Sequence, residues 1–256
     1  MRAILATGSM LLLLAGCATP PPPPPVLTPP EADARGDDAL KAGHAQEALD
    51  DYLIAAKQGD MRGRVGIGQM YFTGIGVVKD FAEASVWLTP PAEAGDKKAQ
   101  YILGQMNDTG GSGVVQNRKA AFAWYTKAAA QGESGAAYAL GRAYNFGMGV
   151  TTDYREALRW YTTAANAGNS DAITAIGVLY AEGRGVSQSF KLALGQFQKA
   201  ADMGNGEAMR RIGNLYFDGD GVPHNDTIAY DWMRKAAAAG NQDAARRLAT
   251  RALPEN

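Results

Sequence analysis

Cysteine and histidine are almost missing from this chain, whose 256 residues include one cysteine and two histidines. A single cysteine has no partner for a disulfide within the chain. His44 and His224 lie far apart in sequence, whereas a metal site needs three or four ligands in close geometry. No Ser-His-Asp or Cys-His arrangement is visible either. We therefore expect no catalytic residues, no metal, no cofactor and no small-molecule substrate, so the chain is not predicted to be an enzyme.

An excess of charge of one sign is also lacking, since 25 Lys and Arg balance 26 Asp and Glu to a net charge of −1. A near-neutral chain gives no reason to expect a nucleic acid as partner. No window shows sustained alternation of apolar and polar residues, which excludes a protein built of half-buried strands. Helix-forming residues dominate instead, so the composition favours an all-α protein.

What the chain does contain is a unit that recurs about every 36 residues. Its clearest copy, Ala136–Asn169, reads Ala, Leu-Gly, Tyr, Gly-x-Gly-Val and then a helical run that closes on Ala-x-x-Gly. The glycine after Leu or Ile recurs at Gly68, Gly104, Gly141, Gly177 and Gly213. The closing glycine recurs at Gly95, Gly132, Gly168, Gly204 and Gly240. A fixed period of this size predicts a solenoid of stacked units.

Each unit is predicted to be a pair of helices. In Ala136–Phe146 the apolar and small residues form one helical stripe, and Gly147 stands where a helix ends in a left-handed residue. Asp153 is placed to cap the second helix, and Gly168 stops it. Helices of three or four turns are not stable alone in water, so the units must be stabilised by stacking on one another.

The pattern Ala-x-x-x-Leu-Gly-x-x-Tyr, Gly-x-Gly-Val, Asp, Ala-x-x-Trp, Lys-Ala-Ala-x-x-Gly resembles the Sel1-like repeat, a relative of the tetratricopeptide repeat. The resemblance is specific for fold and only weakly specific for function. It implies an all-α, right-handed solenoid of stacked antiparallel helix pairs. A degenerate capping pair is expected at 31–60 and a C-terminal capping helix and tail at 242–256. Five repeats are expected at 61–96, 97–133, 134–169, 170–205 and 206–241.

Several units depart from the pattern. Pro90 and Pro91 lie inside the second helix of the first unit, which predicts that this helix stops near Leu88 or kinks there. Three glycines within Thr109–Gly113 predict a mobile loop tip in the second unit. The caps of the last two second helices are expected to be Ser189 in the fourth unit, and Asn225 or Asp226 in the fifth.

The first sixteen residues are predicted to be a secretion signal, with Arg2 before an apolar run too short to span a bilayer. The end of this segment, Leu14-Ala15-Gly16-Cys17, resembles the bacterial lipobox. By that resemblance Cys17 becomes the first mature residue and carries acyl chains, and Ala18 favours sorting to the outer membrane, on the periplasmic face of the envelope. The alternative is an ordinary cleaved signal with an incidental cysteine. Residues 17–30 are expected to be a lipid-anchored, proline-rich tether.

In stacks similar to tetratricopeptide repeats, the first helix of each unit lines the concave face. By resemblance, the groove that binds a partner is expected to be lined by Arg62, Gln69, Phe72, Lys98, Tyr101, Gln105, Tyr138, Arg142, Asn145, Phe146, Arg210, Asn214 and Phe217. Such a mixture suits an extended peptide, because amide side chains bond its backbone and aromatic side chains supply contact area. The alternative is that these residues only cover a solvated groove.

The leading hypothesis is a non-catalytic scaffold or adaptor, anchored by lipid in the bacterial envelope, that binds a protein or peptide partner in this groove. A second hypothesis is a structural component of an envelope export or polysaccharide-secretion assembly, which differs from the first only in the partner. A third is a cell-wall-active enzyme. The resemblance that supports the third is to cysteine-rich relatives that staple each unit with a cysteine pair, which this chain lacks.

Overall fold

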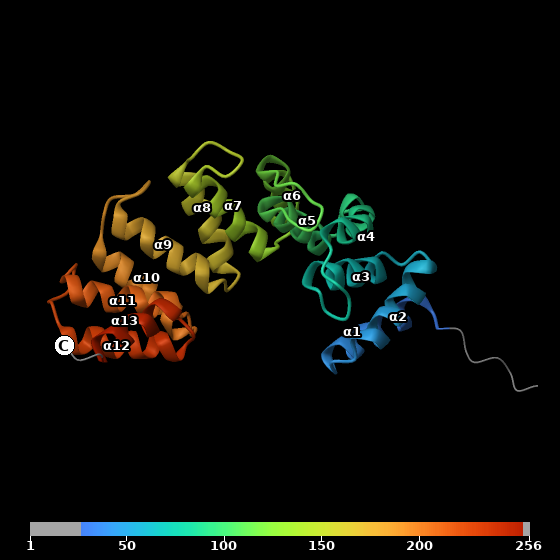
Figure 1. Cartoon of the computed structure of the whole chain (residues 1–256). Helices are drawn as coiled ribbons and strands as arrows, with labels where there is room; N and C mark the ends of the chain where they lie inside the picture. The colour runs from blue at the N-terminus through green and yellow to red at the C-terminus, as the bar shows by residue number, and fades with distance from the viewer. Residues whose placement is uncertain (1–26, 253–256) are drawn as a thin grey trace, which may run out of the picture.

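The computed structural model describes residues 27–252, and this part of the chain is all-helical apart from turns, loops and one isolated β-bridge between Gly111 and Val114. The predicted all-α fold class is confirmed. Thirteen helices follow one another along the described residues (Figure 1). They are α1 (Pro29–Lys41), α2 (Ala45–Lys57), α3 (Met61–Thr73), α4 (Phe81–Glu93), α5 (Lys97–Thr109), α6 (Arg118–Ala130), α7 (Ser134–Phe146), α8 (Tyr154–Asn166), α9 (Ser170–Glu182), α10 (Phe190–Asp202), α11 (Gly206–Asp218), α12 (Asp226–Ala238) and α13 (Gln242–Ala252).

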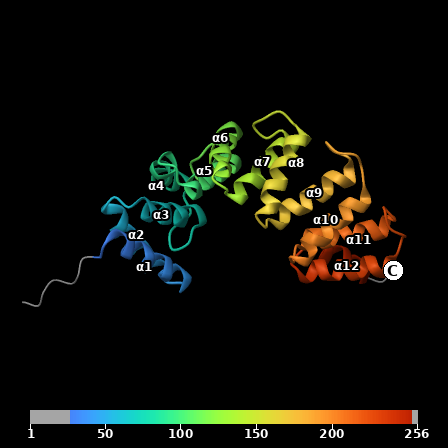
Figure 2. The same cartoon turned by 180° about the vertical axis from the view of Figure 1, so that it is seen from behind.

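The helices pair in sequence order, α1 with α2 through α11 with α12, and each pair packs on the next. Figures 1 and 2 show that the pairs follow an arch, with α3, α5 and α7 on its inner side and α4, α6 and α8 on its outer side. In the series α1, α3, α5, α7 and α9, each helix directly contacts the next one in the series, which brings their backbones together at the inner edge. This arrangement makes the inner side of the arch a groove lined by the first helix of each pair.

The helix ends follow the caps that the sequence predicts. The Asp153 carboxylate accepts hydrogen bonds from the backbone N–H groups of Arg155 and Glu156, and Gly147 ends α7 in the left-handed conformation. Ser189 caps α10, and Asn225 rather than Asp226 caps α12. These caps satisfy backbone donors that have no partner within the helix, so they fix where each second helix begins.

Removing one of these caps tests its contribution. We expect Asp153→Ala to lower the free energy of unfolding by about 1 kcal/mol, because two donors in the first turn of α8 lose their acceptor. Urea unfolding followed by far-UV circular dichroism measures this loss. Asp153→Asn keeps an acceptor oxygen and serves as the control. Equal losses in both variants would show that the cap is not what Asp153 contributes.

The core of each pair is built on small residues. Alanines on both helices are fully buried, and a large side chain of the second helix lies against the glycine that follows Leu or Ile. At Gly141 a Cβ atom would lie 2.4 Å from Tyr161 Cδ1, a distance that no side chain accommodates without a shift. The same glycine position meets Tyr125 in the second unit and Phe197 in the fourth. In the first and fifth units the position meets Leu88 and Met233 instead, so the glycine recurs because a large side chain of the second helix occupies the space of its own.

Neighbouring units are joined at a second recurrent glycine. Gly149, the second glycine of its turn, has φ +78°, and a Cβ there would lie 2.3 Å from the backbone oxygen of Arg118 at the start of α6. The corresponding glycines of other turns abut the start of the second helix in the preceding pair in the same way, as Gly185 does at Tyr154 and Gly221 at Phe190. Each turn thus packs its backbone on the preceding unit, which sets the spacing of the stack.

The prediction that the helix with two prolines stops near Leu88 is wrong, because α4 continues to Glu93 and has the length of the other second helices. Proline fixes φ at a value that a helix uses, so the loss is confined to two missing backbone donors. The last turn gains instead from burial, since Pro91 and Ala92 lie in the core. Whether the prolines kink α4 stays a prediction.

Two other segments bear on what the sequence predicts, and the mobility of the first stays a prediction. The loop Thr109–Gly113 is closed by two backbone hydrogen bonds between Gly111 and Val114, and the carbonyl of Ser112 accepts from the N–H of Ala82 on α4. The expected tether also ends before Pro30, because α1 begins at Pro29. Thr28 and Glu31 form a capping box there, and proline is well suited to a first turn that needs no N–H.

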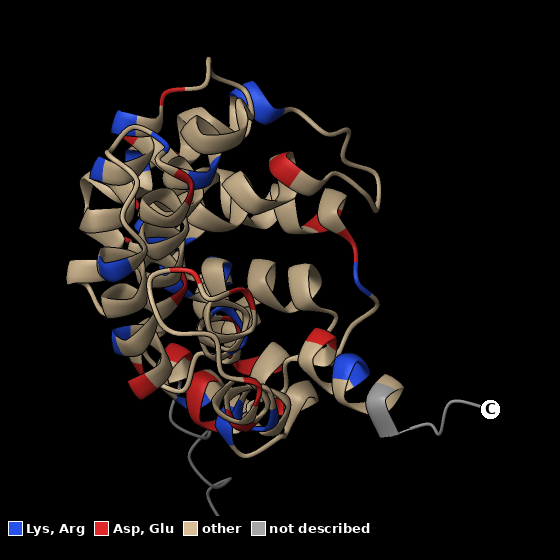
Figure 3. Ribbon diagram, turned by 90° about the vertical axis from the view of Figure 1, so that its left-hand side faces the viewer, with Lys and Arg blue, Asp and Glu red and all other residues tan. Residues whose placement is uncertain are grey.

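None of the helices within residues 27–252 has both the length and the apolar character that crossing a membrane requires. Acidic and basic side chains are scattered over these helices rather than gathered by sign (Figure 3). The stack is closed at its C-terminal end by α13, where Ala244 is fully buried against α12 and the exposed Arg246 and Arg247 face solvent.

Candidate functional site

The inner side of the arch carries a row of hollows, which we number from the N-terminus. The first hollow, of about 230 Å³, lies between α1, α2, α3 and the start of α5, and the second, of about 270 Å³, between α3, α5 and α7. The third, of about 200 Å³, lies between α7, α9 and α11, and the fourth, of about 470 Å³, at α9, α10 and α11. Together they form the groove.

The first hollow is polar, and several of its charged residues are held by hydrogen bonds or ion pairs. Arg62 lies 3.6 Å from Asp33 and 3.3 Å from Asp60, while Tyr52 donates a hydrogen bond of 2.7 Å to Asp37. Burial raises the pKa of Asp33, and the charge of Arg62 opposes this rise. These contacts tie the capping pair α1–α2 to α3, so this hollow has a structural role in joining the cap to the first unit.

The second hollow is aromatic. Phe72 stacks on Phe81 with ring centroids 5.4 Å apart, and the amide of Gln105 donates to the hydroxyl of Tyr101 at 3.1 Å. Burial raises the pKa of Tyr101 and of Tyr125 beneath it, so both phenols stay neutral at physiological pH. The hollow offers ring faces together with neutral hydrogen-bonding groups.

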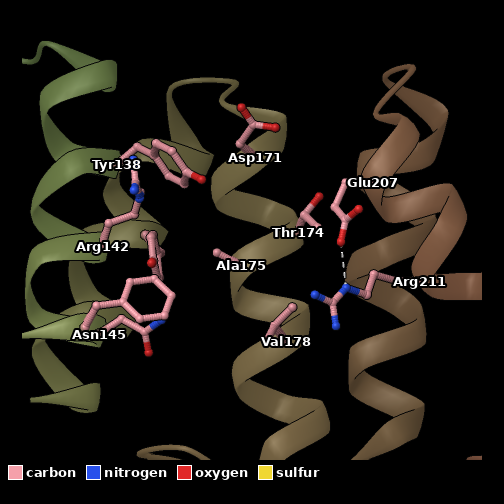
Figure 4. Close-up of a pocket in the computed structure, with 11 residues that line it drawn as sticks. Tyr138, Arg142, Asn145, Asp171, Thr174, Ala175, Val178, Glu207 and Arg211 are labelled. Carbon is pink, nitrogen blue, oxygen red and sulfur yellow. Dashed lines mark hydrogen bonds and ion pairs between the residues drawn. The ribbon is translucent and has the colours of Figure 1, made fainter. Parts of the chain in front are cut away.

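The third hollow combines charge, amide and aromatic side chains from three helices (Figure 4). Tyr138, Arg142 and Asn145 lie on one face of α7, at positions i, i+4 and i+7, and the exposed Phe146 follows them. Burial raises the pKa of Tyr138, and the nearby Arg142 lowers it. Across the hollow, α11 presents Glu207 and Arg211, which form an ion pair of 2.8 Å.

Comparison with known families matches the Sel1 repeat to residues 64–96, 97–133, 134–169, 170–205 and 206–241, which is more than half of the chain. The chain is a Sel1 repeat protein. No curated protein sequence matches it significantly. Proteins built of Sel1 repeats are generally non-catalytic scaffolds that mediate protein–protein interaction.

Solved structures with Sel1 repeats are similar to this chain. A Sel1 repeat protein from Oxalobacter formigenes is 30% identical with a TM-score of 0.78, over 88% of this chain and 92% of that one. A protective antigen of uropathogenic Escherichia coli strains is 29% identical with a TM-score of 0.74, over 86% of this chain. This chain matches only 48% of that antigen's length. An immunity protein from Pseudomonas aeruginosa, 21% identical with a TM-score of 0.53, shares the fold.

Most of the residues expected in the groove line one of the hollows. Arg62, Gln69 and Lys98 line the first; Phe72, Tyr101, Gln105, Tyr138 and Arg142 the second; Tyr138, Arg142, Asn145 and Phe146 the third; and Asn214 the fourth. Arg210 and Phe217 do not join them. Arg210 pairs with Glu207 at 2.5 Å, and Phe217 packs edge-on against Tyr230 with Arg247 over its ring. Partner binding at this set of residues stays a prediction.

Sequence reasoning missed the far wall of the third hollow. Asp171, Thr174 and Val178 of the fourth Sel1 unit hold the register positions of Lys98, Tyr138 and Arg142 in other units, so the repeat period itself was the signal. Glu207 holds the same position as Asp171 in the fifth unit. Arg211 has no such signal, since the corresponding positions carry glycine, isoleucine or alanine. It reaches the hollow because its guanidinium bonds Glu207 one turn earlier.

The described residues offer little for chemistry other than binding. Within 27–252, no three His, Cys, Asp or Glu side chains come close enough to hold a metal ion. His44 and His224 are exposed and lie beside Glu47 and Asp226. Cys17 lies outside the described residues.

Proposed function

We propose that this Sel1 repeat protein is an adaptor anchored by lipid in the bacterial cell envelope, and that it holds an extended segment of a partner protein in the groove. The row of hollows along the first helices carries the proposal, because aromatic, amide and cationic side chains follow one another along it. Amides bond a peptide backbone, and rigid rings add contact area at low entropic cost. An extended peptide is the partner that uses such a row along its length.

The position in the envelope is supported by the sequence before α1. The apolar leader and Leu14-Ala15-Gly16-Cys17 support acylation at Cys17, with the protein on the periplasmic face of the outer membrane. The proline-rich residues that follow would separate the groove from the lipid surface. In this arrangement the adaptor concentrates its partner near the membrane without entering it.

Photo-crosslinking in intact cells tests the proposal. A photoreactive amino acid at Phe146, which is 61% exposed in the groove, is expected to give discrete adducts with a partner protein. The control position is Val86 on α4, which is 66% exposed and lines none of the hollows. Mass spectrometry of the adducts then identifies the partner.

The adducts should be specific to the groove and should depend on the anchor. Cys17→Ser is expected to release the chain from the membrane fraction, because the acylated cysteine is lost, and to reduce adducts with envelope partners. The same adducts at Phe146 and Val86 would refute the groove. Retention of Cys17→Ser in the membrane would refute the lipid anchor and leave the groove as a separate result.

A further inference from the structure

The third hollow exists because the fourth unit carries small residues at its groove positions. Thr174 and Val178 stand where Tyr138 and Arg142 stand one unit earlier, and Ala175 lies between them. Figure 4 shows Ala175 and Val178 on α9, with the side chains of α7 on one side of them and those of α11 on the other. The long side chains of α7 and α11 thus face each other over the short side chains of α9, which leaves an open space of about 200 Å³ between them.

Four charged residues line the walls of this hollow, Arg142, Asp171, Glu207 and Arg211, and of these only Arg142 has no hydrogen bond or ion pair among the described residues. Burial alone would raise the pKa of Glu207, but hydrogen bonds from Arg210 and Arg211 outweigh it and hold that pKa below its usual value. Asp171 accepts a hydrogen bond of 2.7 Å from Asn205. The lining therefore holds two guanidinium groups and two carboxylates, and Arg210 lies outside it. The guanidinium left without a carboxylate among the described residues is that of Arg142.

Asn145 adds an unused acceptor to the same wall. The residue is only 8% exposed, its amide is hydrogen-bonded to the hydroxyl of Tyr161, and its Oδ1 is buried with no partner among the described residues. A buried carbonyl oxygen without a donor is costly, so it needs an explanation. Other units carry Phe72, Asp108 or Phe217 at this position, so the fold does not require an amide here. Asn145 lines the hollow, and the ring of the neighbouring Phe146 is 61% exposed.

We propose that the third hollow is the pocket in which the groove recognises an acidic side chain of an extended peptide, with Arg142 binding the carboxylate and Asn145 accepting a backbone N–H. This rests on the peptide-binding function proposed above and adds the chemical class of the partner. A single carboxylate matches the one guanidinium that has no partner in the hollow, whereas a more highly charged anion would also meet Asp171 and Glu207. An acidic residue in an extended segment presents both the anion and the N–H donor that the wall lacks.

Peptide libraries test the inference on the full-length, lipidated chain in detergent micelles. Each library of N-acetylated, C-amidated nonapeptides has Asp, Glu, Asn or Gln fixed at the centre and random residues elsewhere. We expect the immobilised chain to retain the Asp and Glu libraries about tenfold more than the Asn and Gln libraries. A ratio of this size is the effect expected from one strong carboxylate–guanidinium contact. Arg142→Gln should erase this preference. Arg155→Gln, which removes an exposed charge on α8 outside the hollows, should keep it.

Asn145→Leu separates the two contacts. We expect it to lower the retention of every library, because the acceptor for the backbone is lost whichever residue is fixed. Circular dichroism of each variant checks that it folds. If Asn145→Leu does not fold, Arg142→Gln still decides the test. Arg142 is exposed and has no partner among the described residues, so its replacement should leave the fold intact.

Each contrary outcome has a distinct meaning. Equal retention of acidic and amide libraries, or an acidic preference that survives Arg142→Gln, overturns this inference and leaves peptide binding intact. A Gln library with a free C-terminal carboxylate, retained as well as the Glu library, would assign the pocket to chain ends and overturn the side-chain assignment. Retention of no library at all would overturn the proposed function itself.

Discussion

Replacing Tyr161 with alanine is expected to lower the free energy of unfolding by about 3–5 kcal/mol, as truncation of a large buried ring does. Tyr161 is only 1% exposed and packs against the backbone of Gly141 in the third unit, near the middle of the stack. The space it leaves is bounded by Gly141, which has no side chain to fill it, and by the ring of Tyr138, whose centroid lies 5.7 Å from that of Tyr161. Urea unfolding of the purified chain, followed by far-UV circular dichroism, measures the loss.

The same variant should also broaden the unfolding transition. In a solenoid each unit contacts only its neighbours, so a weakened central interface uncouples the units on either side. Tyr161→Phe is the control, since it keeps the ring and removes only the hydroxyl that bonds Asn145, at a cost of about 1 kcal/mol. If both variants lost equal stability, the ring would not be what holds the third unit together.

Gly149→Ala is expected to cost about 2–5 kcal/mol through two separate effects. A left-handed residue with a side chain costs about 1–2 kcal/mol, and φ at Gly149 is +78°. Overpacking adds about 1–3 kcal/mol, since the new Cβ would lie 2.3 Å from the backbone oxygen of Arg118, which no rotamer change can relieve. The turn must then move away from α6, and the contact between the second and third units opens.

Gly168→Ala separates the two effects. Gly168 has φ +83°, but a Cβ there would meet no atom within 4 Å, so only the conformational cost applies. Thermal and urea unfolding of the two variants should therefore differ by at least about 1 kcal/mol, with Gly149→Ala the less stable. Equal stabilities would mean that the turn shifts freely and that close backbone contact does not set the spacing of the stack.

The repeat architecture could be predicted from the sequence because its causes are local. The left-handed residue at Gly147 and the cap at Asp153 are each decided within a few positions, and their recurrence defines the unit. The path of the helix through Pro90 and Pro91 could not be predicted, because burial of that turn against the next unit outweighs a local rule. Here the tertiary environment overrode the propensity.

The groove could be predicted only in part, for a related reason. Register places Tyr138, Arg142 and Asn145 on one face of a first helix, so the near wall of the third hollow follows from sequence. The hollow itself depends on what the next unit lacks at the same positions, and on how Glu207 holds the side chain of Arg211. The hollow and the position of the Arg211 side chain depend on three helices together, so the sequence of a single unit does not predict them.

The direct contacts between successive first helices also bear on how the protein would respond to load. When the two ends of such an arch are pulled apart, each contact between neighbouring units bends a little. The deformation is therefore distributed over all the contacts instead of being confined to one. Bending of this kind moves the hollows closer together or further apart by small steps. The separation of the hollows would then change with the load applied to the two ends of the arch.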